Sequence, residues 1–137
     1  MLFTEQNTDL FLCDYIRSLH ILFTQRYFLP VKRTDICTKN EQGRIIIDAK
    51  YYRRTLVNHY DREKIHSQNL YQLFSYLLNQ QRIDCPDSFK TRGSLIYPDT
   101  GKEIDLEYWY NQHLIQIKTL NLNVNWKEIE ERLRGVV

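Results

Sequence analysis

The stretch Arg44-Ile45-Ile46-Ile47-Asp48-Ala49-Lys50 decides how this 137-residue chain folds. Its three consecutive isoleucines predict a central strand that is buried on both faces. Side chains alternate between the two faces of a strand, so Asp48 and Lys50 are expected on the same face. An acid and a lysine at the end of a buried strand require a reason, and a role in a chemical reaction is one such reason.

A turn at Asn40-Glu41-Gln42-Gly43 precedes this strand and predicts a β-hairpin. Pairing Lys39 with Arg44 across the turn would place Asp35 directly opposite Asp48. Cβ atoms of directly paired residues in an antiparallel ladder lie roughly 4.5–5.5 Å apart. The hairpin therefore predicts two neighbouring carboxylates.

Two carboxylates this close repel each other unless something compensates their charge. A divalent cation with oxygen ligands would do so, and Lys50 on the same face would hold a water or a phosphate beside it. The arrangement is typical of a nuclease. The alternative is an ordinary exposed hairpin on which the charges are incidental.

Composition sets the limits for the rest of the chain. Hydrophobic residues make up 42% of the sequence, which favours one folded domain over residues 1–137. The formal net charge of +2 means that any affinity for nucleic acid depends on local basic clusters and metal ions. The sequence shows neither a membrane-spanning run nor a signal peptide, so we expect a cytoplasmic protein without a membrane partner.

Two helices are predicted on either side of the hairpin. Residues 5–29 begin with an apolar helical stripe and offer the acids Glu5, Asp9 and Asp14. Residues 68–80 form the second helix, with Ser67 as its expected cap. This helix carries a polar stripe beside its apolar face, and its amide and phenol groups can reach a carboxylate, a water or a phosphate. The polar stripe comprises Asn69, Gln72, Tyr76 and Asn79.

The segment of residues 51–66 is basic. It is either a solvated loop or a loop that contacts the phosphates of DNA, because arginine and lysine position a nucleic-acid backbone. The candidate DNA-binding residues are Arg53, Arg54, Arg62, Lys64 and His66.

The last third of the chain predicts three strands and a helix. The strands are expected at residues 93–98, 103–110 and 113–120, with a polar connection over residues 81–92 before them. Asn125 and Glu128 form a capping box for a final helix, whose inner face would carry Trp126, Ile129 and Leu133. The predicted order of elements is α-β-β-α-β-β-β-α.

Three segments in this order resemble the nuclease portion of McrC, the cleaving subunit of the McrBC modification-dependent restriction systems. The resemblance covers residues 29–137 and rests on the ordered set rather than on any single motif. The segments are Leu29-Pro30-Val31-Lys32-Arg33-Thr34-Asp35-Ile36, Ile45-Ile46-Ile47-Asp48-Ala49-Lys50-Tyr51-Tyr52 and His66-Ser67-Gln68-Asn69-Leu70-Tyr71-Gln72-Leu73-Phe74-Ser75-Tyr76-Leu77.

The resemblance implies a restriction-endonuclease-like PD-(D/E)xK fold, an α/β fold in which helices flank a central mixed sheet. It assigns Asp35 and Asp48 as metal ligands together with the backbone carbonyl of Ala49, and Asp14 is a candidate for a further ligand. It assigns Lys50 to the attacking water. Gln72 and Tyr76 would be the Q-x-x-x-Y pair near the site.

The activity implied by the resemblance is Mg²⁺-dependent cleavage of DNA in a defence system, with Mn²⁺ as a substitute ion. The partners implied are DNA and a McrB-like GTPase, and a homodimer would supply the two cuts that duplex cleavage needs. In the family the GTPase is engaged by a region N-terminal to the nuclease part, and we expect this chain to lack it. The alternative function is an inactive nuclease-fold remnant that serves as a binding or assembly module.

Overall fold

A five-stranded mixed sheet forms the centre of the molecule. The computed structural model describes residues 34–51, 56–59 and 62–137, so the predicted helix at residues 5–29 lies outside the described residues. The strands follow the order β1-β2-β5-β7-β6 across the sheet. Strands β2, β5 and β7 are parallel, and the two edge strands are antiparallel to their neighbours. The bounds are β1 (Ile36–Asn40), β2 (Gly43–Ala49), β5 (Arg92–Pro98), β6 (Asp105–Tyr110) and β7 (His113–Leu120).

The predicted α/β class and the mixed sheet flanked by helices are confirmed, in agreement with a restriction-endonuclease-like fold. The hairpin register is also confirmed, since Lys39 pairs with Arg44. Its turn depends on Gly43, whose φ of 112° is a left-handed value that favours glycine. The Oδ1 atom of Asn40 accepts a hydrogen bond of 2.9 Å from the backbone N–H of Gln42 and closes the turn.

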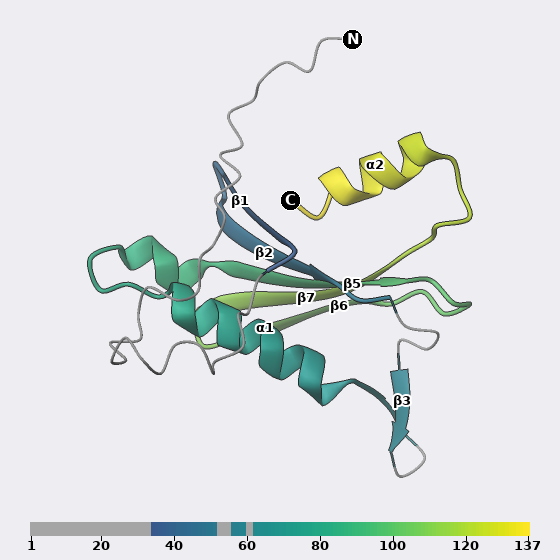
Figure 1. Cartoon of the computed structure of the whole chain (residues 1–137), viewed down its shortest axis with the longest axis horizontal. Helices are drawn as coiled ribbons and strands as arrows, with labels where there is room; N and C mark the ends of the chain where they lie inside the picture. Colours follow the sequence, from purple (N-terminus) through teal and green to yellow (C-terminus); the bar gives the residue numbers. More distant parts are fainter. Residues whose placement is uncertain (1–33, 52–55, 60–61) are drawn as a thin grey trace, which may run out of the picture.

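Helix α1 (Ser67–Gln80) covers one face of the sheet and lies opposite the C-terminal helix in Figure 1. Leu73 and Leu77 of its apolar stripe are fully buried. A Cβ atom on Gly93 of β5 would lie 3.0 Å from methyl groups of both leucines, so helix and strand approach closely there. This face of the sheet contributes Ile46, Leu95, Tyr97, Ile115 and Ile117 to the larger apolar core. The predicted cap at Ser67 is wrong: His66 is the N-cap, without a side-chain cap.

The opposite face is covered much more thinly. Helix α2 (Trp126–Arg134) has no buried residue. Trp126 is 59% exposed, so its predicted place on the inner face is wrong, whereas Ile129 is half-buried and Leu133 lines a hollow with Ile96 and Leu120 of the sheet. The helix is short and highly charged, and the chain beyond it makes the contact instead: Val136 packs with Ile45, Ile47 and Ile96. The predicted cap is confirmed, because Asn125 accepts hydrogen bonds from the backbone N–H groups of the first turn.

The predicted loop of residues 51–66 contains a second, separate sheet. Strands β3 (Leu56–His59) and β4 (Arg62–Ile65) form an antiparallel hairpin. In Figure 1 the β3 strand of this hairpin lies away from the main sheet. The polar connection of residues 81–92 also contains the short helix η3 (Pro86–Lys90). Among the residues that the structure describes, no helix is long and apolar enough to cross a membrane.

Candidate active site

The ion pair between Asp48 and Lys50 lies where β2 ends. The Nζ atom of Lys50 is 2.9 Å from Oδ2 of Asp48, and the two side chains are 14% and 4% exposed. Strand alternation accounts for their shared face, as the sequence predicts. The backbone N–H of Lys50 donates a 2.8 Å hydrogen bond to the carbonyl of Ile96, so the neighbouring parallel strand fixes the backbone of Lys50, two residues after the buried acid.

A relay of hydrogen bonds connects Lys50 to α1. Its Nζ donates to Oε1 of Gln72 over 2.8 Å. The Nε2 atom of Gln72 then donates to the phenol oxygen of Tyr76 over 2.7 Å. Gln72 and Tyr76 lie one helical turn apart and therefore share a face of α1. Tyr76 is 3% exposed, so this end of the relay is anchored in the core.

Asp35 joins the site from the other strand of the hairpin. It lies one residue before β1, and the ladder ends with the pair of Ile36 and Ile47. Asp35 is therefore next in register to Asp48 but does not pair with it in the ladder. Its Oδ2 atom accepts a 2.9 Å hydrogen bond from the backbone N–H of Ala49, which holds this exposed carboxylate at the end of β2.

The electrostatics of the site favour a bound cation. Burial raises the pKa of Asp48 above its usual value, Lys50 opposes that shift, and the nearby Asp35 carboxylate adds to it. Burial also raises the pKa of Tyr76, and the hydrogen bond from Gln72 opposes that shift. Tyr76 is therefore a neutral phenol at neutral pH. Asp48 holds a desolvated carboxylate that one lysine compensates only partly.

The residues present fit a divalent cation. Oδ2 of Asp48 is buried, and the described residue that compensates its charge is Lys50, whose Nζ atom lies 2.9 Å away. Asp35 lies at the same strand end, and its carboxylate together with the backbone carbonyl of Ala49 would supply further hard oxygen ligands. No group of three or more acidic, cysteine or histidine side chains suited to a metal occurs in the described ranges. The described chain thus offers two carboxylates and a carbonyl.

The remaining predicted site residues are not brought to this centre by the described part of the chain. Asp14, Arg53 and Arg54 lie outside the described residues, and only the backbone of Arg62 is described, in β4. Lys64 instead lines a groove of about 770 Å³ between α1 and β6. His66 begins α1.

Sequence reasoning missed a hollow at the edge of the sheet where the centre lies. The parallel strands β2, β5 and β7 end on the same edge of the sheet, and the residues that follow them form a hollow there. Their positions after the strand ends were visible in the sequence, but the parallel pairing that brings them together was not.

Two comparisons with known proteins bear on this site. The sequence profile of a family described as "McrBC 5-methylcytosine restriction system component" matches residues 18–98. A protein of Escherichia coli strain K12, described as "Type IV methyl-directed restriction enzyme EcoKMcrBC", is 36% identical over 109 residues. That match covers 79% of this chain and 30% of the relative, so the chain corresponds to under a third of that protein's length.

Proposed function

The chain belongs to the McrBC 5-methylcytosine restriction system component family, and from this premise we propose that it is the Mg²⁺-dependent DNA endonuclease of such a system. The observation that carries the proposal is the buried Asp48–Lys50 pair, which is connected to Gln72 on α1 and bordered by Asp35. Phosphodiester hydrolysis is the reaction, and duplex DNA is the substrate.

The acids and the lysine have different roles in this proposal. Asp35, Asp48 and the carbonyl of Ala49 hold Mg²⁺, and Mn²⁺ substitutes for it. When bound, the cation supplies charge neutralisation at the phosphodiester and makes water more acidic. Lys50 donates hydrogen bonds to the attacking water or to a phosphate oxygen.

Gln72 and Tyr76 act on Lys50 rather than on DNA. The amine of Lys50 is attached to a flexible chain of four carbons. The hydrogen bond to the amide oxygen of Gln72 limits the positions that this amine can take. Tyr76 fixes the amide in turn, since its phenol is buried and accepts from Nε2. Both are therefore positioning residues. Holding a catalytic group in the productive geometry is worth several kcal/mol in enzymes, on the order of 7 or more in the best cases.

The partners proposed are DNA and a McrB-like GTPase. The description of the E. coli relative as a methyl-directed restriction enzyme supports both. The basic residues Lys64 and His66, with Arg53, Arg54 and Arg62, would contact the DNA backbone. Two cuts in a duplex need two active sites, which a second copy of the chain would supply.

Incubation of supercoiled plasmid with the full chain tests the function. We expect nicked and linear products with Mg²⁺ or Mn²⁺, more of them when a McrB-like GTPase and GTP are added, and none with a chelator. Plasmid that stays intact under all of these conditions, with a correctly folded protein, would overturn the proposal in favour of an inactive binding or assembly module.

A further inference from the structure

A hollow of about 510 Å³ opens at the edge of the sheet where the three parallel strands end. Tyr51 follows β2 directly after Lys50, Pro98 ends β5, and residues 121–123 follow β7. Ligands of open parallel sheets bind in the crevice beyond the carboxyl ends of the strands. The hollow therefore lies at the same strand ends as the proposed catalytic centre but on the opposite face of the sheet, because Tyr51 alternates with Lys50 and Pro98 alternates with Tyr97.

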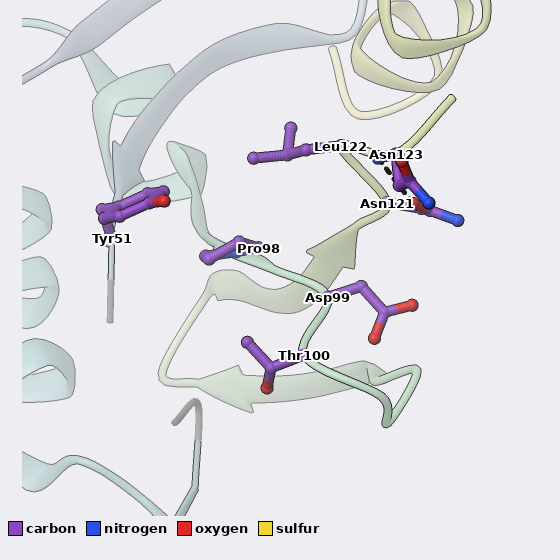
Figure 2. Close-up of a pocket in the computed structure, with 7 residues that line it drawn as sticks. All are labelled: Tyr51, Pro98, Asp99, Thr100, Asn121, Leu122 and Asn123. Carbon is purple, nitrogen blue, oxygen red and sulfur yellow. Dashed lines mark hydrogen bonds between the residues drawn. The ribbon is translucent and has the colours of Figure 1, made fainter. Parts of the chain in front are cut away.

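The lining combines flat apolar surfaces with a polar rim. In Figure 2 the ring of Tyr51 lies at the left and Pro98 lies to its right. The side chain of Leu122 lies above Pro98 and extends toward the side of Tyr51. Tyr51 is 88% exposed and Leu122 is 49% exposed, so both surfaces are accessible. The polar side chains are Asp99, Thr100, Asn121 and Asn123, and in Figure 2 they lie to the right of and below Pro98 and Leu122, away from Tyr51.

Two hydrogen bonds within the loops hold this rim in shape. Oδ1 of Asp99 accepts from the backbone N–H of Gly101 over 2.8 Å, and Oδ1 of Asn121 accepts from the backbone N–H of Asn123 over 2.8 Å. The backbone N–H of Asp99 also donates to the carbonyl of Leu120 over 2.9 Å, which ties the β5 loop to the end of β7. The rim is therefore built before a ligand arrives.

The charge of the residues that line the hollow favours a nucleobase over a phosphate as its ligand. No lysine, arginine or histidine lines the hollow as the described residues form it, and Asp99 contributes a negative charge. A phosphate would be repelled there. A nucleobase has two apolar faces for Tyr51 and Leu122 and a polar edge for amide, hydroxyl and carboxylate groups. The volume is also within the range of small-ligand pockets.

We propose that this hollow binds an unstacked base of the DNA strand next to the phosphate being cut, with Tyr51 as its stacking platform. The proposal rests on the proposed nuclease function. It makes Tyr51 and the loops after β5 and β7 a determinant of where the enzyme cuts. DNA in which a base is already unpaired should be preferred, because unstacking a mispaired base costs less free energy.

The test compares the affinity of the full chain for a short duplex with one mismatch and for the same duplex fully paired, by fluorescence anisotropy without a metal ion. We expect the wild type to bind the mismatched duplex more tightly. Tyr51→Ala should reduce that preference about tenfold, since stacking of a base on an aromatic ring is worth roughly that much. Tyr51→Phe should retain the preference. Tyr108→Ala is the matched control, because this half-exposed tyrosine lies on the β6 edge.

The outcomes separate this proposal from the nuclease function. An unchanged preference in Tyr51→Ala, or no preference in the wild type, overturns the base site even if plasmid is cut. A preference that Tyr51→Ala removes supports the base site even if no plasmid is cut. Absence of any DNA binding overturns the base site and the DNA substrate together.

Discussion

The described residues include two lysine–aspartate pairs of nearly equal length in very different surroundings. Lys50 lies 2.9 Å from Asp48 at the end of β2, and Lys118 lies 2.8 Å from Asp105 at the edge formed by β6 and β7. The aspartate side chain is 4% exposed in the first pair and 63% exposed in the second. Distance therefore does not distinguish the candidate site. Burial does.

A glutamine lies near each of the two ion pairs, and the two glutamines make different hydrogen bonds. Gln72 accepts from Lys50 and donates to a buried tyrosine, so the first pair belongs to a relay. Gln116 donates 2.8 Å to Glu107 and takes no part in the second ion pair. A buried pair whose members are constrained from several sides suits catalysis, whereas an exposed pair contributes roughly 0–1 kcal/mol to stability. The edge pair thus supplies a matched control for each variant of the site.

The largest expected difference is in the rate of DNA cleavage. Lys50→Ala should slow single-turnover cleavage about 10²–10⁴-fold, because it removes the group that acts on the attacking water or the phosphate. Lys118→Ala should leave the rate unchanged, since that lysine pairs with an exposed acid away from β2. Equal losses in the two variants would remove the distinction between the pairs.

Mg²⁺ should stabilise the protein through the first pair only. A ligand that binds only the folded state adds about 2.7 kcal/mol to the free energy of unfolding at 100 times its Kd. We expect Mg²⁺ to raise the Tm of the wild type and of Asp105→Asn, but not of Asp48→Asn. A retained rise in Asp48→Asn would place the ion elsewhere.

Substitution of the two glutamines should produce a smaller difference in cleavage rate. Gln72→Ala frees the amine of Lys50 without removing it, so the cleavage rate should fall about tenfold, which corresponds to about 1.4 kcal/mol. Gln116→Ala should not change the rate. A fall in thermal stability alone, with the wild-type rate, would show that Gln72 is only structural.

The smallest effect concerns the pH dependence of stability without metal. Because burial raises the pKa of Asp48 above 3.8, the folded state holds this proton more tightly than the unfolded state. The stability from this group is complete below pH 3.8 and falls as the pH rises through the raised pKa. Asp48→Asn should therefore gain in free energy of unfolding relative to the wild type as the pH rises, measured by urea unfolding in a chelator. A constant difference across this range would contradict the direction of the pKa shift.

Local patterns predicted most of the sheet. The turn residues and the isoleucine run determine the hairpin register, and the polar stripe of α1 places Gln72 and Tyr76 on the face that meets Lys50. The cap predicted helix α2, but none of the apolar residues of this helix is buried.

The failures have two causes. Basic residues obscured the short strands β3 and β4, in which Leu56 pairs with Ile65 at one end of the hairpin. The hollow at Tyr51 and the hydrogen bond from Lys50 to Ile96 both depend on parallel pairing between strands far apart in sequence. Alternation within a strand reports which face is buried but carries no information about which strand lies beside it.

Cleavage of supercoiled plasmid in Mg²⁺ by Asp48→Asn and Asp105→Asn, side by side with the wild type, tests the central claim most directly. The two variants remove the same charge from two ion pairs of nearly the same length. We expect Asp105→Asn to cut at the wild-type rate and Asp48→Asn to leave the plasmid intact. Cutting by Asp48→Asn at the wild-type rate would contradict it.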